Sequence, residues 1–118
     1  MTVKADIRNR ALKLLGAIAA GEAASAEDAA DVDEIYLSVF DELVQENIAV
    51  WGNGTTDEIP EKFVESLARL VAARAAPAFD VPAINGLSPE AVEDRAWMRL
   101  RRMIAPDPTS RPLRVDYF

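Results

Sequence analysis

The stretch from 25 to 49, SAEDAADVDEIYLSVFDELVQENIA, predicts one long amphipathic helix. Ser25 followed three residues later by Asp28 is a variant of the capping box that opens helices. Apolar side chains then recur at helical spacing, at Val32, Ile35, Tyr36, Val39, Phe40, Leu43, Val44 and Ile48. A helix with so broad an apolar face needs other helices to cover it, so this stretch indicates an all-α fold.

Two further helices are predicted on either side of this stretch. With Thr2 as its N-cap, the segment 2–18 gathers on one face Val3, Ile7, Ala11, Leu14 and Ile18. Pro60 suits the first position of the next helix, which Pro77 must end or kink. The inner face of that helix comprises Phe63, Leu67, Leu70, Val71 and Ala75.

A fourth helix is predicted from 88 to 104, SPEAVEDRAWMRLRRMI, because Ser-Pro-Glu is a helix start signal. The side chains expected to face inward are Val92, Ala96, Leu100, Met103 and Ile104. Arg95, Arg99 and Arg102 follow one another at i, i+4 and i+7, with Arg101 beside them. We therefore expect a four-helix domain over 1–105. Prolines at 106, 108 and 112 then hold an extended C-terminal tail over 106–118, whose last residues alternate like a strand.

The composition argues against an enzyme. The chain has 118 residues, which favours one domain, and it contains neither Cys nor His. Thiolate chemistry, the usual acid–base residue near neutral pH and the commonest transition-metal ligand are therefore missing. An acidic cluster could in principle bind a divalent cation, but it matches no calcium-loop spacing and is better interpreted as a solvated helix face. We expect no catalytic residue, no cofactor and no metal.

The charge is acidic overall and unevenly spread. The net charge is −7, so the basic surface that broad nucleic-acid binding needs is missing. Residues 22–65 carry thirteen acidic side chains and one basic, whereas 66–118 carry eight arginines and six acidic side chains. Such asymmetry suggests that unlike-charged surfaces meet within one chain or between copies. No apolar run reaches membrane-spanning length, so we expect a soluble, cytoplasmically made protein with no membrane partner.

Two stretches resemble the head-to-tail adaptor proteins of tailed bacteriophages and gene transfer agents, also called head completion or connector proteins. Residues 11–51 are similar to their opening helical hairpin. An Ala-Leu-x-x-Leu-Gly helix end precedes a Gly-Glu pair and a long acidic helix that ends near a Trp. Residues 58–80, EIPEKFVESLARLVAARAAPAFD, resemble the third helix, which begins at Ile-Pro and closes on Ala-Pro. The pattern departs from the family in the second helix, which reads YLSVFDELV where Leu-Asn is frequent.

The resemblance implies a non-enzymatic protein of the virion neck. Such adaptors form a ring, usually of twelve copies, beneath the portal protein after DNA packaging. They help to retain the genome and present a surface to the next tail or stopper protein. Genomic DNA would pass through the ring without sequence-specific binding, and the protein would be made in the cytoplasm of a bacterial host.

Three candidate contact regions follow. An interface between subunits would join the acidic second helix to the arginines of the fourth, through Glu27, Asp31, Glu34, Arg95, Arg99, Arg101 and Arg102. The arginines could equally be the solvent-exposed side of an amphipathic helix. The acidic face of the second helix could instead line the central passage of the ring. Trp51 either docks a partner from its loop or caps the helical core.

The tail is the third region, expected to dock on the portal or on a neighbouring copy by adding a strand to an exposed edge. Its predicted contact residues are Arg111, Leu113, Arg114, Val115, Asp116, Tyr117 and Phe118. The alternative is a tail that folds back on its own helices.

A rival interpretation belongs to another class of protein. A small helical regulatory or antitoxin-like protein would use the arginine-bearing fourth helix to bind an acidic or nucleic-acid partner. It would be a monomer or dimer without affinity for portal rings.

Overall fold

The all-α fold is confirmed. The computed structural model describes residues 2–18 and 24–104, which form four α-helices, one short 3-10 helix and no strand. The α-helices are α1 (Lys4–Leu14), α2 (Ala26–Gln45), α3 (Glu61–Ala75) and α4 (Pro89–Ile104), and the 3-10 helix η1 spans Ala76–Phe79. No helix in these ranges is both long and apolar enough to cross a membrane.

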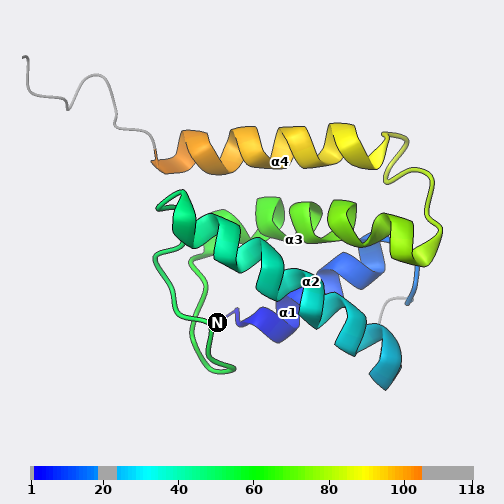
Figure 1. The fold of residues 1–118 in the computed structure, drawn as a ribbon, viewed down its shortest axis with the longest axis horizontal. Coiled ribbons are helices and arrows are strands. Elements are labelled where there is room, and N and C mark those ends of the chain that lie inside the picture. The colour runs from blue at the N-terminus through cyan, green and yellow to red at the C-terminus, as the bar shows by residue number, and fades with distance from the viewer. Residues whose placement is uncertain (1, 19–23, 105–118) are drawn as a thin grey trace, which may run out of the picture.

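Helix α3 lies at the centre of the fold. It packs against α1, α2 and α4, and Figure 1 shows it between α4 on one side and α1 on the other, with α2 crossing in front. Ten of its fifteen residues are buried, including Phe63, Leu67 and Leu70. Because α3 is covered on several sides, its sequence is apolar over more than one narrow stripe. The predicted stop at Pro77 is confirmed, since α3 ends at Ala75 and continues only as η1.

Helix α1 begins differently from the sequence prediction. Its N-cap is Val3, whose backbone N–H donates to the Asp6 carboxylate at 3.0 Å. The predicted cap, Thr2, instead donates its hydroxyl to Glu61 Oε1 at 2.7 Å, while the N–H of Ile59 donates to the Thr2 carbonyl at 2.7 Å. Thr2 as N-cap was therefore wrong, because contacts with the start of α3 compete successfully for its polar groups.

Helix α2 begins as predicted, with the N–H of Asp28 donating to Ser25 Oγ at 3.1 Å. It ends at Gln45, four residues before the predicted end at Ala49. Asn47 has a φ of 60°, in the left-handed region that ends helices. Val44, predicted to face inward, keeps 48% of its surface exposed, whereas Val39 and Leu43 are fully buried.

A tight turn brings the chain from η1 back to α4. Ile84 and Leu87 exchange backbone hydrogen bonds of 2.8 and 3.0 Å across Asn85 and Gly86, which both have positive φ. Two positive φ values define a type I′ turn, and Asn-Gly is the pair that adopts it most readily. The following Ser88 caps α4 by accepting the N–H of Ala91 at 3.2 Å, as the Ser-Pro-Glu signal predicted.

Candidate functional site

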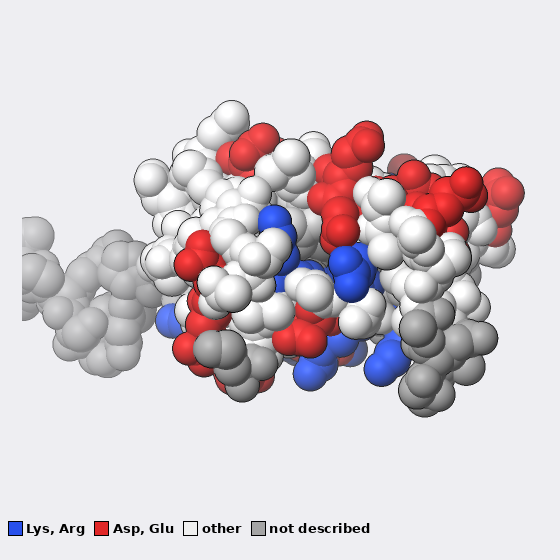
Figure 2. Space-filling view, turned by 90° about the horizontal axis from the view of Figure 1, so that it is seen from below, with Lys and Arg blue, Asp and Glu red and all other residues white. Residues whose placement is uncertain are grey.

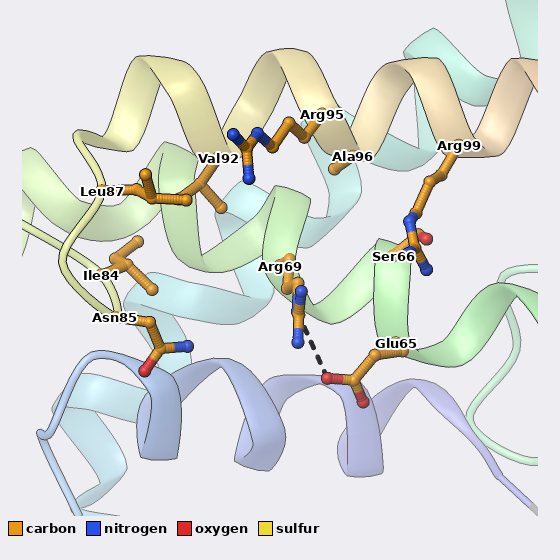
Figure 3. A pocket seen from close by; sticks show the side chains of 10 residues that line it. All are labelled: Glu65, Ser66, Arg69, Ile84, Asn85, Leu87, Val92, Arg95, Ala96 and Arg99. Carbon is orange, nitrogen blue, oxygen red and sulfur yellow. Dashed lines mark ion pairs between the residues drawn. The ribbon is translucent and has the colours of Figure 1, made fainter.

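A cleft with a volume of about 140 Å³ lies between α3, α4 and the Asn85–Gly86 turn. Figure 3 shows it from the side of α1, with α4 above and α3 behind. Its apolar walls come from Ile84, Leu87, Val92 and Ala96, and its polar lining comes from Glu65, Ser66, Arg69, Asn85, Arg95 and Arg99. Apolar walls with a few convergent polar groups are the usual make-up of a binding site.

The charge in and around this cleft is strongly positive. Arg10 and Arg69 both contact Glu65, at 3.3 Å each, so this one carboxylate is shared between two guanidinium groups. Arg95 and Arg99 on α4 are exposed, and no carboxylate of residues 2–18 or 24–104 forms an ion pair with either. The cleft therefore offers guanidinium groups that no described carboxylate neutralises, and such groups bind carboxylates and phosphates in bidentate fashion.

Ser66 adds an unusual polar group to the cleft. Its side chain is 2% exposed, and within the described part of the chain its hydroxyl has no hydrogen-bond partner. A buried hydroxyl without a partner is costly, and such groups in native proteins are few. In Figure 3 the guanidinium group of Arg99 points down from α4 toward Ser66. A ligand atom that accepts a hydrogen bond from Ser66 would remove that cost.

Arg101, predicted to lie at a subunit interface, has an acidic partner within its own chain. Arg101 donates to both carboxylate oxygens of Glu46 on the same chain, at 2.9 and 3.0 Å, and its guanidinium carbon lies 4.9 Å from the centre of the Trp97 ring. Six residues along a helix correspond to a rotation of about 240° from Arg95, so Arg101 turns away from the row that includes Arg99. The hydrogen bonds from Arg101 lower the pKa of Glu46.

A second arginine, Arg74, joins three helices on the α2 side of the fold. It donates to both oxygens of Glu42 on α2, at 2.6 and 2.9 Å, and to Glu93 on α4 at 2.9 Å. The hydrogen bonds that Glu42 accepts from Arg74 lower the pKa of Glu42. Arg74 is thus engaged by carboxylates of two other helices of its own chain. Arg74 was not predicted from the sequence as a contact residue, although its position one turn after the buried Leu70 and Val71 was an available signal.

The predicted acidic interface residues lie on the N-terminal half of α2. Glu27, Asp31 and Glu34 are exposed, and within the described ranges none of them forms an ion pair, whereas Asp33 contacts Arg8 at 3.2 Å. Figure 2 shows acidic side chains gathered at the upper right, where the N-terminal part of α2 lies. Among the described residues, no group of three or more His, Cys, Asp or Glu side chains is arranged to hold a metal ion.

Trp51 belongs to the core, in agreement with the second of its two interpretations. It is 8% exposed, its Nε1–H donates to Tyr36 Oη at 3.2 Å, and its ring lies 5.2 Å from that of Phe63. Burial raises the pKa of Tyr36. The exposed position that loop docking requires is therefore absent. The predicted tail contacts, Arg111 to Phe118, and the domain boundary at 105 lie outside the described residues.

Comparisons with protein-family models, with curated proteins and with solved structures give no match for this chain. The interpretation of the site therefore depends on its own geometry. The arginines were predicted from the sequence, whereas the cleft, Ser66 and Asn85 were not. Ser66 follows Phe63 by three residues on the apolar face of α3, and a polar residue at such a position was the available signal.

Proposed function

We propose that this protein is a structural adaptor of a phage neck, a small helical subunit that assembles with copies of itself beneath a portal ring. The chain would help to retain packaged DNA and would link the head to the next tail or stopper protein. The proposal has two supports. One is the resemblance of 11–51 and 58–80 to head-to-tail adaptors. The other is the separation of charge over the surface of the subunit.

The charge separation is the observation that carries the proposal. Helix α4 carries arginines at the cleft that form no ion pair with any described carboxylate. Helix α2 carries acidic residues that form no ion pair with any described basic side chain. Contacts between different surfaces of identical copies are heterologous, and they produce rings when the rotation closes. Acidic surfaces that face a passage would also repel DNA and let it slide.

The experiment is light scattering coupled to size exclusion, performed on the free protein and on its mixture with a cognate portal ring. We expect the mixture to elute as one complex whose mass exceeds that of the portal by several adaptor subunits, about twelve if each portal subunit of a dodecamer holds one. A free monomer is compatible with the proposal, because such rings can close on their template. Absence of any complex with the portal would contradict it.

The rival is a regulatory or antitoxin-like protein, and the arginine-lined cleft is the observation in its favour. This rival predicts a discrete complex with an acidic protein or a nucleic acid and no complex with the portal. A fluorescently labelled duplex DNA titrated with the protein tests the nucleic-acid form of the rival. The adaptor proposal expects no binding at physiological ionic strength, because the whole chain carries a net charge of −7.

A further inference from the structure

Three of the four exposed arginines of α4 form a regular row. Arg95, Arg99 and Arg102 follow the spacing i, i+4 and i+7, which places them on one face, at about 6 Å and 10.5 Å along the axis from the first. Within the described ranges none of the three is engaged in an ion pair. Arg101 is excluded from this arginine row by its bonds to Glu46.

The acidic residues of α2 form a matching row. Glu27, Asp31 and Glu34 follow the same spacing, i, i+4 and i+7, so their side chains emerge at the same intervals along their helix. All three are exposed, and they too form no ion pair with any described residue. The arginine row and this acidic row therefore match in length, in interval and in number of charges.

The two rows cannot meet within one molecule. Helix α2 crosses in front of α3 in Figure 1, whereas Figure 3, seen from the other side, shows Arg95 and Arg99 turned toward the viewer with α2 behind α3. A partner that neutralises either row would therefore have to come from outside the described part of the same chain. Every other copy of the chain presents the acidic row, whose charges are opposite to those of the arginine row and recur at the same intervals.

We propose that the acidic row of one copy packs against the arginine row of the next, with Asp31 of one copy at Arg99 of the other. This inference rests on the proposed function in one respect, namely that copies of the chain associate. It adds which two surfaces touch. Asp31 and Arg99 occupy the middle of their rows, so they come together whether the two helices run parallel or antiparallel. The floor of the cleft beside Arg99 contains the hydroxyl of Ser66, a donor for an incoming carboxylate or a bridging water.

Crosslinking tests the pairing directly, because the chain has no Cys and each introduced thiol is unique. Asp31→Cys and Arg99→Cys proteins are prepared separately, mixed and treated with a short bis-maleimide, both free and on portal rings. The matched control replaces Asp31→Cys with Asp41→Cys, an exposed acid about 15 Å further along α2. We expect at least about tenfold more crosslinked dimer from the Asp31/Arg99 mixture than from the control mixture, because the pairing raises the effective concentration of the two thiols. Equal yields overturn the pairing.

Charge reversal provides a second measurement that does not depend on a crosslinker. One variant carries Arg95→Glu and Arg99→Glu, the other Asp31→Arg and Glu34→Arg. Each variant alone presents like charges to its own copies, whereas a mixture restores opposite charges wherever a copy of one variant meets a copy of the other. With the first variant labelled with ¹⁵N, we expect its α4 amide signals to shift on addition of the second variant and to stay constant on addition of unlabelled first variant. Identical spectra in both titrations overturn the pairing.

The outcomes separate this inference from the adaptor proposal. If wild-type protein binds portal rings but the Asp31/Arg99 crosslink is no better than its control there, the pairing is wrong and the adaptor role stands. If the crosslink and the charge reversal succeed but no portal complex forms, the pairing stands and the adaptor role is wrong. If inorganic phosphate alone shifts the α4 signals and no specific crosslink forms, the cleft binds a small anion and the pairing is overturned.

Discussion

Arg74 on α3 donates through Nη1 to Glu42 Oε2 on α2 at 2.6 Å, and through Nε to Glu93 on α4 at 2.9 Å. One guanidinium group thus connects three helices. Its side chain is 26% exposed, against 41% for Glu42 and 30% for Glu93, so this network is screened less than the ion pair between Arg69 and Glu65.

Replacing Arg74 by Met should destabilise the protein by about 1–2 kcal/mol, because two partly buried carboxylates lose a charged donor. Met preserves most of the apolar stem, so the loss reports on the charge network. Urea unfolding followed by circular dichroism measures it. The matched control is Arg69→Met, which removes a more exposed pair and should change the free energy of unfolding by less than about 0.5 kcal/mol. Equal losses in both variants would contradict the structural role of Arg74.

The same network predicts a dependence on pH. The hydrogen bonds from Arg74 lower the pKa of Glu42 in the folded state, so their contribution is fully present above the pKa of Glu42 in the unfolded chain. It is lost as the pH falls through the lower, folded-state pKa. We expect wild type to melt at a higher temperature than Glu42→Gln at pH 7, and the gap to narrow below about pH 4.5. A gap that stays constant down to pH 3 would exclude this linkage.

Trp51→Ala should cost about 3–5 kcal/mol, because it removes a large ring from the core between Tyr36, Phe40 and Phe63. Tyr36→Phe removes only the acceptor of the Trp51 N–H and should cost about 1 kcal/mol. Both are measured by denaturant unfolding. Trp51→Phe keeps much of the packing and is the variant for binding assays. Portal affinity that falls in Trp51→Phe without a loss of stability would restore the docking interpretation.

Replacing Ser66 or Ser25 by Ala should change the stability of the protein in opposite directions. Ser66→Ala removes a buried hydroxyl that has no partner among the described residues, so stability should stay the same or rise by less than about 1 kcal/mol. Ser25→Ala removes the hydroxyl that caps α2 and should cost about 1 kcal/mol. Melting temperatures of the two variants provide the comparison. A large loss in Ser66→Ala would show that its hydroxyl is satisfied in solution.

Deletion of residues 109–118 tests whether the C-terminal tail is a docking arm, as predicted from the sequence. If the arm binds the portal, the helical circular dichroism signal and the melting temperature should hold while portal binding falls sharply, because many weak arms on one ring act together. Size exclusion of the truncated protein with portal rings provides the measurement. Unfolding of the truncated protein, or portal binding equal to that of the full chain, would refute the arm.

Local sequence signals were enough to predict the four helices. Apolar spacing located all of them, and Ser25, Ser88 and Pro60 lie at the helix starts because caps and N-terminal prolines act within one turn. Thr2 failed as a cap because its hydroxyl bonds to Glu61, 59 residues away. A polar side chain with both a local and a distant partner cannot be assigned from its neighbours in sequence.

The candidate site was predictable only in part, for the same reason. The spacing of Arg95 and Arg99 follows from helix geometry and needs no tertiary information. The capture of Arg101 by Glu46 and the burial of Trp51 against Tyr36 depend on which helices become neighbours. The cleft depends on the Asn85–Gly86 turn reaching α3, a contact that no local pattern encodes.

The central place of α3 has a consequence for synthesis on the ribosome. The first two helices emerge before α3, which packs against both of them, and the hydrogen bonds of Thr2 form only after Ile59 and Glu61 have been made. The part of α2 that α3 covers therefore stays open to solvent until roughly two thirds of the chain has been made, which at about 5–20 residues per second is a delay of several seconds. A nascent chain in this interval is the form most exposed to aggregation and to chaperones.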